Sequence, residues 1–376
     1  MVGPALPDSV DIPEDRVGIE RRVGQYWVNG ARRFGAAIRV FLPSVGSILI
    51  TETFIGIFLA IVASNVLSNL ALTRYEGRLG PKFFLLLFSG LMVASGLLLA
   101  LTASTLLLLL AFLIGNISTT GTEAGPFQSI ETGVLPRAHA MGGINRVFGY
   151  YNVLGYGAAS LGALAASIPG YANDALTIFR LLYLTYAFVG ALLFVLYLGL
   201  GDLEGAKTGP AREADQPSPK VDEDMERISL FYSVDSFGGS FVSSHSSRIG
   251  SLVYKVSLVD LGVIFFVVNL VTTLSIFGAA LIAERVGNLK TMVVTHLVSS
   301  VFLSVIPFAG SLTLALLFLF LRQSVSQMDV PTRQAFMAEV FNAQDLVRAN
   351  STTNTFRSIG GLFGGPISGV LYATGL

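Results

Sequence analysis

The chain has 376 residues, of which 52% are hydrophobic and 13% are charged, and its formal net charge is zero. Soluble domains carry about a quarter of charged residues, so this composition excludes an ordinary soluble protein. A neutral chain has no general attraction for nucleic acid. The sequence contains no cysteine, which excludes disulfides, thiolate nucleophiles and cysteine-bound metals.

The N-terminal segment is polar, carries charges of both signs over residues 1–28 and lacks the apolar core of a signal peptide. We therefore expect residues 1–30 to form a retained cytoplasmic segment.

Apolar runs of about 20 residues follow, the length that lets a helix cross about 30 Å of hydrocarbon. The sequence predicts helices at 31–50, 53–73, 83–102, 104–123, 144–168, 176–200, 229–250, 257–283, 291–309, 311–330 and 351–374. The predicted fold class is an all-α membrane protein with about 11 transmembrane helices, grouped in bundles at 31–200 and 228–376.

Between these sets, residues 201–227 contain Pro210, Pro217 and Pro219 among many charged residues and predict a flexible cytoplasmic linker. A small folded domain is the alternative, but this segment has too few apolar residues to bury a core. Lys and Arg lie mainly in alternate loops, and the positive-inside rule assigns those loops and the N-terminus to the cytoplasm. The sequence therefore predicts a multi-pass protein of the cell membrane.

An internal repeat relates the two sets of helices. Three landmarks recur at an offset of 205 to 207 residues: Arg78, Pro126 and Gly155 in the first half, and Arg285, Pro331 and Gly360 in the second. Such repeats are typical of transporters. The offset predicts a partner for the sixth helix beyond Leu376, so we expect a 12-helix pattern that lacks its last helix.

The repeated loops resemble those of the major facilitator superfamily. Ala283–Lys290 is similar to the loop after the eighth helix, with Glu284 in place of the usual Asp; in Glu76–Lys82, Gly77 occupies that Asp position. Ser326–Phe336 resembles a segment of the prokaryotic efflux-like members. The resemblance implies two six-helix bundles joined by a cytoplasmic linker.

In that family these loops are thought to act as a cytoplasmic gate. We expect ion pairs between Arg78 and Glu123 and between Arg285 and Asp329, each holding an outward-open state; solvated charges at helix ends are the alternative. The candidate gate residues are Glu76, Arg78, Lys82, Glu123, Glu284, Arg285, Lys290, Asp329 and Arg333.

Ionisable residues inside a membrane span are costly and mark cavities or proton relays. Asp235 is the candidate for proton coupling, and Arg39 suits an anionic substrate. His245 is a weaker relay candidate, since the seventh helix can also end near Phe241. The candidates for proton coupling or substrate contact are Arg39, Asp235, His245, Arg357, Asn65, Asn116, Asn152 and Asn269. The four asparagines also suit hydrogen bonds between helices.

Small residues at Gly361, Gly365 and Gly369 predict close helix packing. The run with Gly365-Pro366 also resembles an antiporter signature, although it lies on the eleventh helix rather than the fifth.

No phosphate-binding loop, zinc motif or nucleophile elbow is present, so we expect neither an enzyme nor a cofactor. The favoured function is secondary active transport by alternating access, with proton-coupled export of a small organic solute or drug. Its partners would be that solute, protons and the lipid bilayer. The alternatives are a uniporter or importer of the same fold, and a non-transporting receptor or inactive truncated remnant.

Overall fold

The computed structural model describes residues 47–117, 125–137, 143–201, 219–248, 258–342 and 345–373. Within these ranges every regular element is a helix and no strand is present, which confirms the predicted all-α fold. The expected first helix at 31–50 lies outside the described residues except for its last few.

The helices before the linker are α2 (Ser47–Leu101), α3 (Thr105–Ile114), α4 (Pro126–Val134), the 3₁₀ turn η1 (Leu135–Arg137), α5 (Ile144–Ala165), η3 (Ile168–Gly170) and α6 (Ala175–Gly199). After it come α7 (Pro219–Arg248), α8 (Leu258–Val286), α9 (Asn288–Val305), η5 (Ile306–Phe308), α10 (Leu312–Ser326), α11 (Asp329–Val340) and α12 (Leu346–Ala373). In the described part of the chain, five helical segments are long and apolar enough to cross a membrane: Gly56–Leu101, Ile144–Gly170, Ala175–Gly199, Val259–Val286 and Asn288–Val305.

The element α2 is two helices joined at Gly80, whose backbone has φ 78° and ψ 157° and is not helical. Its first helix is already formed at Ser47, whereas the sequence predicts a turn at 51–53. The polar residues Thr51, Glu52 and Thr53 suggested that turn, but none of them is the Gly or Pro that interrupts a helix.

The fourth predicted helix ends early in the structure, and the tenth is divided. After α3, Gly115 caps the helix and Asn116 takes a left-handed φ of 49°. The chain then forms α4, which begins with Pro126 at its first turn, in a region predicted as a loop. In the second half α10 ends at Ser326 and α11 begins at Asp329.

Helix α7 begins at Pro219, well before the predicted start near 229. The proline at the first position and Asp222 in the first turn both favour a helix start. Met225 and Tyr232 on this helix pack with Met337, Phe341 and other buried residues of α11 and α12. An apolar stripe on an otherwise polar helix therefore extends α7 into the predicted linker.

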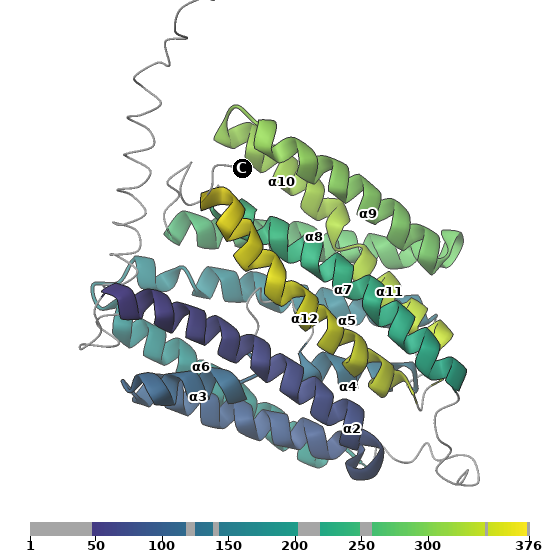
Figure 1. Ribbon diagram of the computed structural model, residues 1–376, viewed down its shortest axis with the longest axis horizontal. Coiled ribbons are helices and arrows are strands. Elements are labelled where there is room, and N and C mark those ends of the chain that lie inside the picture. The colour runs from purple at the N-terminus through teal and green to yellow at the C-terminus, as the bar shows by residue number, and fades with distance from the viewer. Residues whose placement is uncertain are drawn as a thin grey trace, which may run out of the picture.

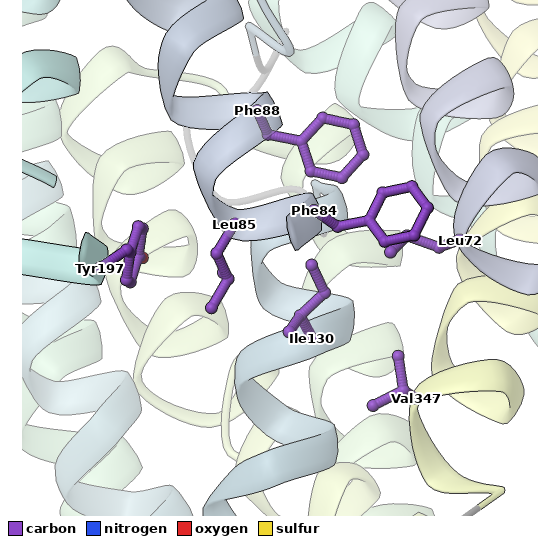
Figure 2. Packing of buried hydrophobic residues seen from close by; sticks show 7 residues of the cluster. All are labelled: Leu72, Phe84, Leu85, Phe88, Ile130, Tyr197 and Val347. Carbon is purple, nitrogen blue, oxygen red and sulfur yellow. The ribbon is translucent and has the colours of Figure 1, made fainter. Parts of the chain in front are cut away.

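The helices before and after the linker pack together along two seams. Helix α5 lies against α8 and α11, while α12 lies against α2 and α4 on one side and against α7 on the other. Figure 1 shows α12 between α7 and α2. A buried cluster joins α2, α4, α6 and α12 through Leu72, Phe84, Leu85, Phe88, Ile130, Tyr197 and Val347 (Figure 2).

Candidate functional site

A small polar pocket lies between the two sets of helices. Helix α4 contributes to its wall from the first half, and α7, α11 and α12 contribute from the second. The lining residues are Gln128, Thr132, Tyr232, Arg333, Gln334, Met337, Asn350, Thr353, Asn354 and Arg357. Side chains that can donate hydrogen bonds dominate this lining, and two of them are arginines.

Two contacts hold Arg333 on the pocket wall, and its side chain is largely buried. Its Nη1 atom lies 3.5 Å from Oδ2 of Asp329, one helical turn earlier on α11. Its guanidinium carbon lies 5.4 Å from the ring centroid of Tyr232 on α7. Only 12% of the Arg333 side chain is exposed, so its charge is available mainly to a molecule inside the pocket.

Arg333 was predicted as a gate residue and Arg357 as a substrate candidate, and the structure brings both to one pocket. The neutral members of the lining were not predicted. A signal for them exists on α12, where Asn350, Asn354 and Arg357 recur at the three- to four-residue spacing of one helix face. On α4 Gln128 and Thr132 share a face in the same way.

Beside the pocket, hydrogen bonds between polar side chains join the two halves along the seam of α2, α4 and α12. Asn354 donates to Ser129 at 2.8 Å, and Ser129 donates to Asn69 of α2 at 2.7 Å. Asn350 donates to Thr132 at 2.9 Å. The five side chains in these bonds are buried or half-buried, so each bond replaces a lost contact with water.

The second seam, between α5 and the later helices, has its own polar contacts. Asn152 of α5 donates to Gln334 of α11 at 2.6 Å. At the start of α5, Nε and Nη2 of Arg146 donate to the two carboxylate oxygens of Glu284, at 2.8 and 3.0 Å. This bidentate pair ties the beginning of α5 to the last turn of α8.

The Arg146 pair lies at what we call the linker end of the bundle, the end where α6 finishes and α7 starts. The glycine turns at Gly80 and Gly287 lie there too, and Lys82 donates a hydrogen bond to the carbonyl of Leu200 just after α6. Arg348 of α12 pairs with Asp222 of α7 at 3.1 Å at the same end.

The candidate gate residues occupy this end and the adjoining part of α11. Arg78, Arg285 and Lys290 are exposed, and Glu76 is half-buried. The structure pairs Glu284 with Arg146, and it pairs Asp329 with Arg333 rather than with Arg285. Glu284 meets Arg146 because α5 packs on α8, whereas Asp329 meets Arg333 because the two residues are one turn apart on α11. Glu123 lies outside the described residues.

Asp235 on α7 faces α9, where its Oδ1 atom lies 3.2 Å from Nε2 of His296. The contact is an ion pair when the imidazole is protonated. His296 was not among the predicted candidates, although a histidine inside the predicted helix 291–309 is a signal that could have found it. Arg39 lies outside the described residues, and so does the side chain of His245, which belongs to the last turns of α7.

The four candidate asparagines lie at contacts between and within helices. Asn65 donates to the carbonyl of Ile61, and Asn116 accepts from Ser68 of α2 at 2.7 Å. Asn152 bridges the halves as described above, and Asn269 is half-buried on α8. None of them is among the residues that line the pocket.

Long apolar helices around a polar pocket between two halves define a multi-pass membrane protein of the transporter class. The chain belongs to the major facilitator superfamily, because residues 34–365 match the family described as Major Facilitator Superfamily. This confirms the predicted membership of the superfamily. The family consists of transporters, which also confirms that the chain is not an enzyme.

Two similar proteins are a yeast protein and a human one. The chain is 26% identical over 382 residues to the uncharacterized membrane protein YJR124C of Saccharomyces cerevisiae, covering 90% of this chain and 84% of the yeast protein. The fold is similar to the crystal structure of the human organic anion transporter MFSD10 (TETRAN), with a TM-score of 0.68 and 18% identity. That match covers 95% of this chain and 88% of the human chain.

Proposed function

We propose that this protein is a secondary active transporter that exports a small organic solute in exchange for protons, by alternating access around the pocket. The observation that carries the proposal is the composition of the pocket wall, to which α4 of the first half and α11 and α12 of the second contribute. A site shared by two halves changes its access when the halves rock against each other.

The substrate that suits this pocket carries an anionic group. Arg333 and Arg357 supply two guanidinium groups, and Asn350 and Asn354 supply amide donors. Guanidinium groups bind carboxylates through paired hydrogen bonds. Asp329 offsets part of the charge of Arg333, which leaves room for one anionic group rather than several. The human protein of similar fold is named an organic anion transporter, which supports the same substrate class.

Alternating access needs a gate that forms and breaks, and the contacts at the linker end suit that role. They comprise the Arg146–Glu284 pair and the polar contacts between α12 and the helices α2 and α4. The predicted gate residues Arg78, Arg285 and Lys290 lie at the same end of the bundle, so they can act together with these contacts. The distribution of Lys and Arg supports a cytoplasmic linker end and N-terminus, in the cell membrane.

A proton gradient would drive export through a group that binds a proton during the cycle. Asp235 is a candidate in the second half, since it lies beside His296 on a neighbouring membrane helix.

The test is transport by the purified protein in liposomes, with a panel of labelled organic anions and neutral analogues, with and without an imposed pH gradient. We expect uptake of at least one anion and faster uptake with the gradient. Arg333→Gln and Arg357→Gln should each weaken apparent affinity about 10- to 100-fold, because each removes a charged hydrogen-bond donor. Arg180→Gln, at an exposed position on α6, is the matched control and should transport normally.

Two outcomes would contradict the proposal in different ways. Equilibration of a solute without any response to the pH gradient supports the uniporter on the same fold. Specific binding of a solute without any flux supports a receptor.

A further inference from the structure

A second polar site lies in the first half and is made of residues that do not themselves line the pocket. Glu131 of α4 accepts two hydrogen bonds from tyrosines on neighbouring helices. Tyr151 of α5 donates to Oε2 at 2.6 Å, and Tyr197 of α6 donates to Oε1 at 2.8 Å. One carboxyl group therefore joins three helices.

The surroundings of this carboxyl are largely apolar. Ile130, the residue before it, is fully buried in the cluster of Figure 2, and Tyr197 belongs to the same cluster. The ring of Phe127 stacks on Tyr197 with centroids 6.4 Å apart, and Phe88 of α2 contacts Phe127. Glu131 itself is half-buried beside this apolar cluster.

No basic side chain of the described residues forms an ion pair with Glu131. The titratable groups that face it are the two phenols, Tyr151 and Tyr197. Three basic residues of the neighbouring helices are engaged elsewhere: Lys82 with the carbonyl of Leu200, Arg146 with Glu284, and Arg348 with Asp222. Within the described ranges, the side-chain hydrogen bonds to this carboxyl group therefore come from two hydroxyl groups.

We propose that Glu131, with Tyr151 and Tyr197, is a proton-binding site of the first half, and that its protonation is coupled to the contact between the halves. The inference rests on the proposed proton-coupled transport. A protonated carboxyl keeps one good acceptor oxygen for two phenol donors, so proton binding removes or redirects one of the two hydrogen bonds. The positions of α5 and α6 relative to α4 then change.

Residues next to this site in the chain form hydrogen bonds to the other half of the protein. Thr132, next to Glu131 on α4, accepts from Asn350 of α12, and Asn152, next to Tyr151 on α5, donates to Gln334 of α11. Asn350 and Gln334 both line the pocket. A shift of α4 or α5 on protonation therefore acts directly on two contacts between the halves, beside the substrate.

The experiment compares wild type and Glu131→Gln in liposomes, in two assays of the same anion. One assay measures uptake driven by an imposed pH gradient, and the other measures exchange at equal pH on both sides. Gln has the shape of the carboxyl group and cannot titrate. We expect gradient-driven uptake to fall more than 10-fold while exchange stays within about two-fold of wild type, since exchange needs no net proton movement.

The matched control is Glu339→Gln on α11, an acid that accepts a hydrogen bond from Asn288 at 2.7 Å. It should behave as wild type in both assays. If wild-type uptake does not respond to the pH gradient, the proposed proton coupling itself fails. If wild type responds and Glu131→Gln responds equally, the proposed proton site is wrong and the transport proposal stands.

Tyr197→Phe tests the same proposal if Glu131→Gln does not fold. The phenylalanine ring keeps the packing against Phe127 but removes one donor to the carboxylate, which makes proton binding easier. We expect the pH profile of transport to move toward higher pH. A purely structural role for the Glu131 cluster predicts lower activity with an unmoved pH profile, which would overturn the proposal.

Discussion

Gly80 and Gly287 adopt nearly the same unusual backbone conformation at equivalent places in the two halves. Gly80 has φ 78° and ψ 157°, and Gly287 has φ 96° and ψ 150°. They lie 207 residues apart, within the offset of the sequence repeat. Each joins two consecutive antiparallel helices, the two parts of α2 in one case and α8 and α9 in the other. The same glycine turn is therefore the structural counterpart of the repeat.

This conformation predicts that alanine is poorly tolerated at Gly287. Positive φ with extended ψ is open almost only to glycine, and forcing another residue into it costs about 1–3 kcal/mol. No atom lies within 4 Å of a Cβ added at Gly287, so the cost is one of backbone conformation rather than of collision. We expect Gly287→Ala to lower the thermal unfolding temperature in detergent micelles.

Gly157→Ala is the control for this prediction. Gly157 lies within helix α5, and a Cβ added there also meets no atom within 4 Å. Alanine favours helix by about 0.5–1 kcal/mol over glycine, so this variant should be as stable as wild type or more stable. Equal stability of the two alanine variants would show that the turn at Gly287 tolerates a side chain.

The repeat made much of the fold predictable from sequence, since Arg78 and Arg285 mark the same turn in each half. The early end of the fourth predicted helix and the division of the tenth were harder to predict. Pro126 was read as a landmark within a loop, but at the first turn of a helix a proline is well tolerated, and α4 begins there. Helix α7 was predicted too short because Met225 finds its apolar partners only on α11 and α12, far along the chain.

In the candidate site, too, some residues could be predicted from the sequence, whereas their interaction partners could not. Arg333, Arg357 and Glu284 were named from their charge and position. The partner of Glu284 depends on which helices pack together, because Arg146 lies 138 residues away in sequence. Glu131 was missed because it lies in a segment predicted as a loop, where an acidic residue is ordinary.

The close packing of α5 on α8 leads to a prediction about the closed state of the linker end. A Cβ added at Gly149 of α5 would lie 2.8 Å from Cβ of Ala280 on α8, closer than two carbon atoms approach. Gly149→Ala should separate these helices and weaken the closed state by about 1–3 kcal/mol.

The measurement uses the natural absence of cysteine in the chain. Spin labels on Leu79→Cys and Leu289→Cys, exposed positions beside the two glycine turns, report the distance between the halves by pulsed electron resonance. Gly149→Ala should add a longer-distance population. Gly155→Ala, one and a half turns further along α5 with no atom within 4 Å of its added Cβ, should not, and a shift of equal size in both variants would count against the packing explanation.

The Arg146–Glu284 pair predicts a smaller effect on the same distance distribution. Half of the Arg146 side chain is exposed, and exposed ion pairs contribute little because water screens them. Glu284→Gln should therefore raise the open population only about two- to five-fold. The exchanged pair, Arg146→Glu with Glu284→Arg, should recover most of the closed population, whereas either single reversal should not. If the exchanged pair does not recover the closed population, the ion pair is not part of the gate.

The contact between Asp235 and His296 predicts an interaction that depends on pH. Their side chains are 33% and 52% exposed and lie 3.2 Å apart, so the attraction exists when His296 carries a proton and weakens as pH rises and that proton is lost. Transport rates of Asp235→Asn, His296→Gln and the double variant should therefore deviate from additivity more at an acidic than at an alkaline assay pH, because only a protonated imidazole forms an ion pair with the carboxylate. Ser300→Ala, on the same helix as His296 with its hydroxyl bonded to the carbonyl of that residue, is the control and should combine additively with Asp235→Asn at both pH values. Non-additivity of the Asp235 and His296 changes that is equal at both pH values would mean that the two side chains interact without an ionised imidazole.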